Sequence, residues 1–234
     1  MIITIDGPAG SGKSTVARNL ATRLGFIHLN SGALFRAVAV FARDQGVSLS
    51  DELELARLSK QLRFGFIPES SGTSFSVNGT RITEELSGEE VGALASAVAL
   101  LPAVREVLLN VQRELGKAHS LVVEGRDSGT VVFPDAEKKF FLVANETARA
   151  KRRLKQLLTG EESEGLVPSE LLKRHGWNDE KAALEAIRKQ LGGRDRQDGE
   201  RKIAPHRKAD DAVEIDTSEI GADEVVEKML ALLK

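Results

Sequence analysis

The stretch Ile2-Ile3-Thr4-Ile5-Asp6-Gly7-Pro8-Ala9-Gly10-Ser11-Gly12-Lys13-Ser14-Thr15 carries the strongest structural signal in the chain. Its first residues, 2–5, are short, apolar and mostly β-branched, which predicts a buried strand. Residues 7–14 fit the pattern G-x-x-x-x-G-K-[ST], and 13–24 have apolar residues at helical spacing before Gly25. A strand, a glycine-rich loop and a helix in this order predict the first unit of a parallel α/β sheet that binds phosphates.

The glycine-rich loop has the chemistry that a nucleoside triphosphate requires. Its glycines let backbone N–H groups converge on anionic oxygens, and the following helix adds its positive N-terminal end. Lys13 is expected to reach the β- and γ-phosphates, and Ser14 to hold Mg²⁺. Glu124, at the end of a later strand, is a candidate to order Mg²⁺-bound water. The predicted ATP-binding residues of the loop are Gly7, Pro8, Ala9, Gly10, Ser11, Gly12, Lys13, Ser14 and Thr15.

The rest of the chain continues the alternation of strands and helices. Further strands are expected at 26–29, 121–124, 139–143 and 213–216, and helices at 31–43, 51–62, 88–100, 102–117, 145–158 and 222–233. Residues 63–83 contain short apolar runs around Asn78-Gly79, a strong turn signal, and predict a small antiparallel insert. Residues 160–193 are polar and charged, with two short helical patches. We therefore expect one α/β domain over 1–234 with a central parallel sheet.

Composition excludes several classes of protein. The 234 residues include 33 Lys and Arg against 35 Asp and Glu, a formal charge of −2, which argues against a protein that coats nucleic acid. The absence of Cys excludes disulfides, cysteine zinc sites and a cysteine nucleophile. The longest nearly apolar run, 91–104, is 14 residues long and contains Pro102, short of the roughly 20 residues that span a membrane. No basic leader precedes the first strand, so we expect a cytoplasmic protein without a membrane partner.

Arginines are placed where they can meet phosphates. Arg126 and Asp127 follow the strand at 121–124, and ligands of open α/β sheets bind at the carboxyl ends of strands. Arg36 follows the second expected strand. Two further groups each share one helix face by their spacing. They are Arg149, Arg152 and Arg153 in the first, and Arg194, Asp198 and Arg201 in the second.

The reaction class follows from which groups are present. The strings N-K-x-D and D-x-x-G of a GTPase do not occur, and the four histidines have no metal spacing. His28 is expected to be a structural residue of a strand, and no general base stands out. An acceptor that is already an anion, such as a nucleoside monophosphate, needs no base if positive charges suppress the repulsion between two polyanions. The sequence therefore predicts phosphoryl transfer to a phosphate.

At this point the sequence resembles the bacterial cytidylate kinases, which phosphorylate CMP and dCMP, over nearly its whole length. Besides the loop, the matching strings are 30–36 (NSGALFR), 96–99 (SAVA) and 102–106 (PAVRE). The most specific are 124–136 (EGRDSGTVVFPDA) and 194–205, in which R-D-x-x-D-x-x-R precedes Ala204-Pro205. The resemblance implies a three-layer P-loop kinase with a central parallel sheet, a monophosphate-binding insert at 63–95 and a lid at 155–193.

The resemblance also implies residue roles. The residues facing the cytosine or its surroundings would be Ser31, Ser96, Arg105 and Asp127. The ribose would be held by Arg194 and Asp198. The acceptor phosphate and the transferred group would be clamped by Arg36, Arg126 and Arg201, which with Lys13 form the catalytic set. The start of the lid over ATP would be formed by Arg149, Arg152 and Arg153. The cofactor would be Mg²⁺, the partners ATP and CMP or dCMP, and the protein a monomer.

The chain departs from the family pattern in three places. Asn30 stands where an acidic residue is usual, and Phe35 stands where Tyr is usual, so any hydrogen bond from those side chains is in question. The region 159–193 is longer than expected and contains Trp177. It is either a tolerated surface insertion or an altered lid that contacts a neighbour or the nucleotide.

Two alternatives remain open from the sequence. A related small-molecule kinase would act on UMP or on a non-nucleotide alcohol, and an alcohol would require a carboxylate base, for which Asp6 and Glu124 are the candidates. A P-loop ATPase switch would show a long basic stripe and stimulation by polynucleotides, against which the near-neutral charge argues.

Overall fold

The computed structural model describes residues 1–69, 72–81, 89–159 and 167–233. Its centre is a sheet of five strands in the order β2-β6-β1-β7-β8, and every pair is parallel. The strands are β1 (Ile2–Asp6), β2 (Ile27–Asn30), β6 (Leu121–Gly125), β7 (Lys138–Val143) and β8 (Val213–Asp216). This confirms the predicted parallel sheet, and Asp6 lies between Gly125 and Phe141 at its carboxyl edge.

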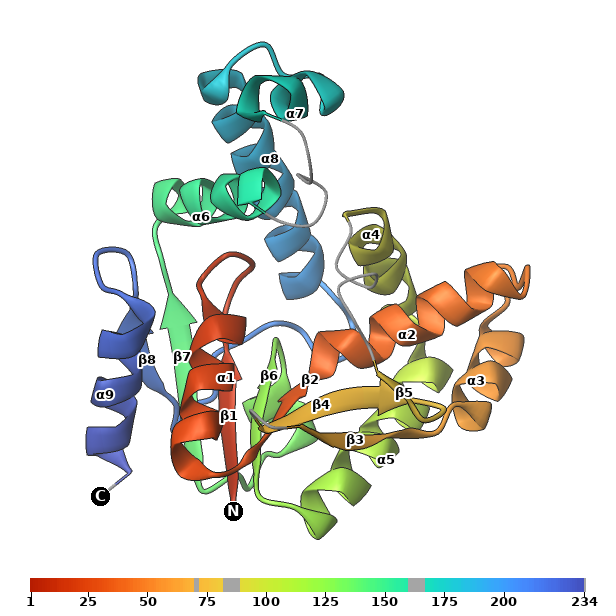
Figure 1. Cartoon of the computed structure of the whole chain (residues 1–234). Helices are drawn as coiled ribbons and strands as arrows, with labels where there is room; N and C mark the ends of the chain where they lie inside the picture. The colour runs from red at the N-terminus through yellow and green to blue at the C-terminus, as the bar shows by residue number, and fades with distance from the viewer. Residues whose placement is uncertain (70–71, 82–88, 160–166, 234) are drawn as a thin grey trace.

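Helices cover both faces of this sheet and form the outer two layers (Figure 1). On one face α1 (Lys13–Leu24) and α9 (Ala222–Leu232) pack on Ile3, Ile5 and Phe140. On the other face α2 (Ser31–Asp44), α3 (Glu52–Gln61) and α5 (Pro102–Ala118) share one apolar core with Leu121 and Val123. Because both faces are covered, the central strands β1 and β6 are buried along nearly their whole length and are mostly apolar, as parallel strands usually are. The three-layer α/β architecture is thus confirmed.

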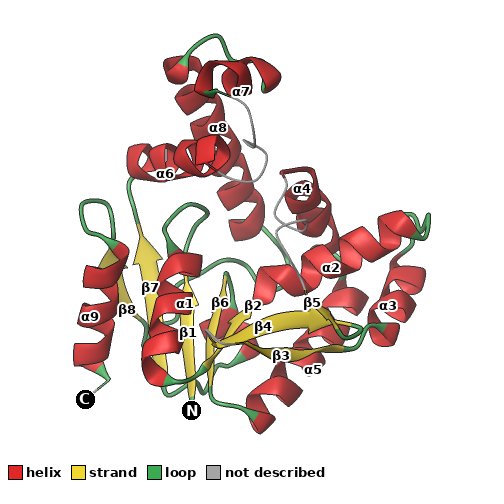
Figure 2. Cartoon of the chain, in the orientation of Figure 1, coloured by secondary structure: helices red, strands yellow, loops and turns green. Residues whose placement is uncertain are grey.

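A second, smaller sheet lies on the side of the molecule that carries α2, α3 and α5 (Figure 2). It consists of β3 (Phe64–Glu69), β4 (Gly72–Val77) and β5 (Thr80–Arg81), all antiparallel. The predicted turn is present, since Asn78 and Gly79 have φ of 53° and 78°. Residues 70–71 and 82–83 of the insert predicted at 63–83 lie outside the described residues, as do residues 84–88 of the longer insert, 63–95, that the resemblance implies. The helix after it, α4 (Glu89–Val98), is shorter than the predicted 88–100.

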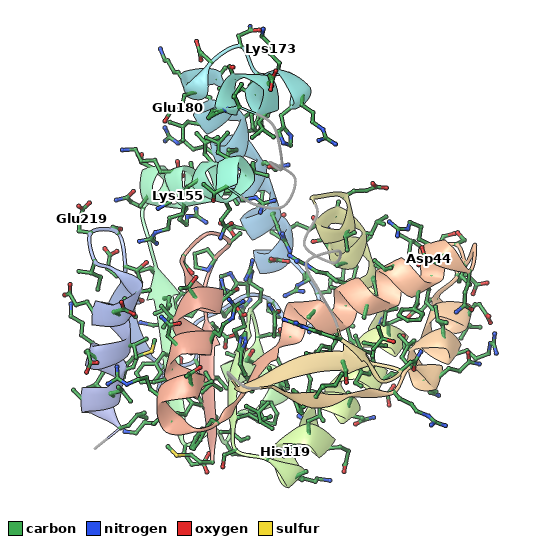
Figure 3. The ribbon with its side chains drawn as sticks, in the orientation of Figure 1. Asp44, His119, Lys155, Lys173, Glu180 and Glu219 are labelled. Carbon is green, nitrogen blue, oxygen red and sulfur yellow. The ribbon has the colours of Figure 1, made fainter. Side chains whose placement is uncertain are left out.

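Three helices stand above the carboxyl edge of the central sheet (Figure 1). They are α6 (Glu146–Thr159), α7 (Pro168–Arg174) and α8 (Glu180–Gly199), and we call them the upper helices. Asn145 caps α6 as its sequence suggests, because its side chain accepts a hydrogen bond from Ala148 N at 2.8 Å. Trp177, between α7 and α8, stacks on His175 with ring centroids 4.8 Å apart. Figure 3 shows Lys155, Lys173 and Glu180 pointing outward from these helices.

The prediction of two short helical patches within 160–193 is wrong in its extent. α8 is one helix of 20 residues that continues past this region to Gly199. Gly192-Gly193 weakens its helical pattern, but Ala183, Ile187 and Leu191 are buried against α6 and hold the helix together. The short π-helical turn η2 (Ser128–Val132), which follows β6, has no signature in the sequence pattern.

Among the described residues, no single helix is long and apolar enough to cross a membrane; residues Glu90–Val98 and Pro102–Ala118 pass that test only as a pair, bent by 97°.

Candidate active site

The glycine-rich loop lies between β1 and α1, directly beneath α6 (Figure 1). Gly10 has a φ of +77°, and a Cβ there would come within 3.1 Å of Arg149 Cβ. Gly7, with a φ of +150°, is more restricted still, because a Cβ would lie 2.2 Å from the Leu142 carbonyl oxygen. Only glycine combines these dihedrals with so little space. The loop is therefore held closely between α6 and β7.

Lys13 begins α1 and turns its ammonium group back under the loop. Its Nζ donates to Pro8 O at 2.6 Å and to Ser11 Oγ at 3.4 Å, and the residue is 6% exposed. Burial, followed by the positive charge of Arg126, holds the pKa of Lys13 well below its usual value, while Glu124 opposes the shift. Negative charge on a bound polyphosphate would favour the ammonium form.

Ser14, Glu124 and His28 form a chain of hydrogen bonds across the sheet edge. Ser14 Oγ donates to Glu124 Oε2 at 2.7 Å, and His28 Nε2 lies 3.0 Å from Glu124 Oε1. Burial raises the pKa of Glu124, but the hydrogen bonds with His28 and Ser14, together with the positive charges of His28 and Lys13, outweigh it and lower the pKa overall. A hydroxyl and an ionised carboxylate are hard oxygen donors, so these residues fit Mg²⁺ that shares its remaining positions with water and phosphates. His28, expected to be structural, thus supports this pair.

A cavity of about 510 Å³ extends from the loop into the space between α2, α4 and α8. The predicted residues that line it include the loop members Ala9, Gly10, Gly12, Lys13, Ser14 and Thr15. The others that line it are Ser31, Arg36, Ser96, Arg105, Arg126, Asp127, Arg153, Arg194, Asp198 and Arg201. Among predicted residues, Gly7, Pro8, Ser11, Arg149 and Arg152 do not line it. The fold thus gathers into one cavity positions that are spread over the chain.

The arginines of this cavity repel one another. Burial, followed by the charges of Arg194 and Arg153, lowers the pKa of Arg36 to about 10. Burial also lowers the pKa values of Arg194 and Arg201. Buried like charges of this kind are costly without an anion, so they mark the cavity as an anion site.

Asp198 organises two of these arginines. Arg126 Nε donates to Asp198 Oδ2 at 3.0 Å, and Arg201 Nε donates to the Asp198 carbonyl oxygen at 3.2 Å. The carboxylate is 8% exposed, so the contacts form with little water present. Asp198 therefore holds the two guanidinium groups beside each other at the end of β6.

The far end of the cavity contains a carboxylate with a fixed partner. Arg105 donates to Asp127 and, at 3.2 Å, to the Ala99 carbonyl oxygen. The same guanidinium lies over the Phe35 ring, 5.4 Å from its centroid. Phe35, which lacks the hydroxyl of the usual Tyr, thus supports Arg105 with its ring face. Asn30, the other departure, caps α2 by accepting from Ala33 N at 3.1 Å.

Several contacts at the glycine-rich loop were not predicted from the sequence. Asp195 accepts from Ala9 N, and Thr217 Oγ1 donates to the Ser11 carbonyl oxygen at 3.0 Å. Arg152, predicted to bind ATP, donates through Nη1 to Thr217 Oγ1 at 2.9 Å. The string R-D-x-x-D-x-x-R could have drawn attention to Asp195, whereas no local signal marks Thr217.

Asp6, a candidate base, is occupied by the backbone. Its two oxygens accept from Ser128 N at 2.9 Å and Gly129 N at 2.7 Å. Burial raises its pKa despite these bonds. This carboxylate therefore anchors η2 to the sheet.

His206 should make stability depend on pH. Burial, followed by the charges of Arg126 and Lys13, lowers its pKa from 6.5 to about 4. The unfolded chain then binds more protons between these two values, so the free energy of unfolding should fall as pH drops from 6.5 towards 4. His206→Phe keeps a ring to stack on Phe141, 5.3 Å away, and should flatten this dependence. Urea unfolding of both proteins at pH 7 and pH 5 measures the free energy of unfolding. An identical change in this free energy between the two pH values in both proteins would contradict the assignment.

The family model and the curated relatives described below match nearly the whole chain. The model of the family described as Cytidylate kinase matches residues 3–234. A cytidylate kinase of Thermosipho melanesiensis is 42% identical over 232 residues, which cover 99% of this chain and 96% of the relative. One of Thermotoga neapolitana is 44% identical with the same coverage, and one of Saccharophagus degradans is 42% identical over 100% of this chain and 97% of its own.

Proposed function

The chain belongs to the cytidylate kinase family, and we propose from this premise that its cavity holds ATP and CMP or dCMP end to end. The protein is a kinase that transfers the γ-phosphoryl group of ATP to CMP or dCMP, giving ADP and CDP or dCDP. The observation that carries the assignment of sites is the cavity itself. It has a phosphate loop at one end, the Arg105–Asp127 pair at the other, and arginines between them.

The donor end binds ATP. The loop amides and the start of α1 hold the β- and γ-phosphates, and Lys13 neutralises the charge that develops on the β–γ bridging oxygen as its bond to phosphorus breaks. Mg²⁺, when bound beside Ser14 and Glu124, supplies further positive charge at these phosphates. Arg153 lines the same end and is placed to meet the triphosphate.

The acceptor end activates a phosphate without a base. An oxygen of the CMP phosphate is already an anion, so it attacks the γ-phosphorus directly once repulsion is suppressed. Arg36, Arg126 and Arg201 supply the suppressing charge, because all three line the cavity between the loop and Asp127. The bond from phosphorus to the acceptor oxygen forms as the bond to ADP breaks. No proton transfer is required.

The base end reads cytosine. Asp127, held by Arg105, accepts a hydrogen bond from the exocyclic amine, and Ser31 and Ser96 contact the rest of the ring. Uracil presents a carbonyl oxygen at the position of the amine, which would face the buried carboxylate without a hydrogen bond and repel it. Arg194 and Asp198 lie between base and phosphate and hold the ribose.

The arrangement in three parts belongs to the same proposal. Residues 63–95 form the monophosphate-binding insert and 155–193 the lid, which excludes water over the phosphates. The proposal further includes a cytoplasmic monomer without a nucleic-acid partner, and the net charge of −2 supports the last point.

One assay tests the function against its rivals. ADP release with Mg²⁺ and ATP is measured with CMP, dCMP, UMP, AMP and shikimate as acceptors. CMP and dCMP should give the highest kcat/KM. A preference for shikimate would point to an alcohol acceptor, for which both oxygens of Asp6 are already taken by backbone amides. A rate that exceeds background only with polynucleotide would sink the proposal.

Replacing Asp127 should erode the choice of base. Asp127→Ala removes the acceptor for the amine, so the ratio of kcat/KM for CMP to that for UMP should fall by about tenfold or more. Asp127→Asn is the matched control, because its amide can turn to donate to the uracil carbonyl and should favour UMP more than Ala does. Steady-state kinetics with both acceptors decide, and an unchanged ratio would mean that the base is recognised elsewhere.

A further inference from the structure

Side chains of the upper helices form hydrogen bonds with the phosphate loop at Ala9. Ala9 N donates to Asp195 Oδ1 at 3.0 Å, and Arg149 Nη1 donates to the Ala9 carbonyl oxygen at 3.1 Å. Arg149 and Asp195 also form an ion pair with each other. Arg149 comes from α6 and Asp195 from α8, so both polar groups of a single peptide residue are held by side chains of two helices.

This junction is closely packed. Ala9 is 7% exposed, and the side chains of Arg149 and Asp195 are 10% and 19% exposed. A Cβ on the neighbouring Gly10 would lie only 3.2 Å from Arg149 O, which is an unusually tight contact. Charge-assisted hydrogen bonds in such a dry site are strong and directional. Movement of α6 or α8 must therefore move Ala9.

The carboxylate is unexpected at a loop that binds anions. Its negative charge opposes a polyphosphate, and it takes up one loop N–H that could otherwise donate to the ligand. Arg149 offsets the charge, and Asp195 also acts to raise the pKa of the nearby Lys13. The two side chains instead fix the orientation of both peptide groups at Ala9.

We propose that Asp195 and Arg149 are positioning residues that lock the phosphate loop at Ala9 in the geometry that binds ATP. The inference rests on the proposed function in that the loop's ligand is ATP. It adds that the upper helices set ATP affinity through this one contact. The effect is on the donor site alone, because neither side chain lines the cavity around the acceptor.

The test measures ATP affinity directly, by calorimetry without an acceptor. Asp195→Ala should weaken ATP binding by about tenfold or more, the effect of one charge-assisted hydrogen bond, while KM for CMP changes less than about twofold. Asp195→Asn keeps an oxygen for Ala9 N and should retain most of the affinity. Asp195→Ala combined with Arg149→Met should be little worse than the poorer single variant, because the two residues act as a unit.

The matched control is the ion pair of Arg188 with Glu146, at 2.9 Å, which joins the same two helices on the exposed side. Glu146→Gln and Arg188→Met should leave ATP affinity unchanged. An equal loss of ATP affinity in these control variants would mean that the contact at Ala9 only supports the upper helices in general, and it would overturn the inference. So would wild-type ATP affinity in a folded Asp195→Ala protein, or an equal loss for ATP and CMP. If Asp195→Ala fails to fold, the ATP affinities of Asp195→Asn and Arg149→Met are compared instead. Arg149→Met should bind ATP more weakly than Asp195→Asn, and equal affinities would overturn the inference.

The outcome is separable from that of the proposed function. A wild-type protein that binds ATP but does not phosphorylate CMP would remove the proposed substrate. The calorimetric comparison of variants would still stand.

Discussion

Lys13→Met is expected to lower kcat by about a thousandfold or more, because Lys13 supplies the charge that matches the β–γ bridging oxygen as it becomes anionic. The Lys13 ammonium is buried beneath the loop, with Nζ 2.6 Å from Pro8 O. A methionine fills the same volume without the charge. The loss should therefore fall on the transition state more than on the binding of CMP.

The fold should survive this change. Burial already lowers the pKa of Lys13, so the ammonium is held in an unfavourable environment when no anion is near. Replacing it by an apolar group of similar size should leave the thermal unfolding midpoint unchanged or higher. Steady-state kinetics and thermal melts on the same preparation measure both. A variant that retains a tenth of the wild-type rate would defeat the assignment of Lys13.

Arg201→Met should be the second most damaging substitution, with kcat reduced by about a hundredfold to a thousandfold, the usual effect of losing one preorganised donor. Its side chain is 6% exposed, and its Nε is held by the Asp198 carbonyl oxygen at 3.2 Å. Among the described residues Nη2 has no hydrogen-bond partner although it is buried. A fixed guanidinium with a free donor is suited to an oxygen of the transferred group.

The split between kinetic constants identifies the role of Arg201. KM for ATP should change by less than about threefold, since the loop and not Arg201 binds the donor phosphates. Arg201→Lys, the control, keeps the charge but loses the planar fork and should recover only part of the rate. Equal losses in kcat and in ATP affinity would assign Arg201 to binding rather than to transfer.

Local patterns explain why much of the architecture could be predicted. The strand, loop and helix of residues 2–24 are each defined by short-range rules, namely β-branching, glycine spacing and helical periodicity, and all three agree. Arg126 and Asp127 could be placed at the site because a strand end in a parallel sheet faces the ligand.

What was missed depends on contacts between distant parts of the chain. Thr217 follows the edge strand β8, which β7 separates from β1, and only the fold brings it to Ser11; sequence spacing gives no hint of that contact. The length of α8 was underestimated because its propensity is weak at Gly192-Gly193, and tertiary packing overrides that weakness. Arg152 turned to Thr217 for the same kind of reason, namely a partner 65 positions away.

Trp177 gives the protein a built-in optical reporter. It is the only tryptophan, there is no tyrosine, and it lies between α7 and α8 against His175. Tryptophan fluorescence therefore comes from one side chain in the upper helices, which is far in sequence from the phosphate loop. Rapid-mixing fluorescence on the unlabelled protein can follow how that point responds when nucleotide arrives, without a dye or an added residue.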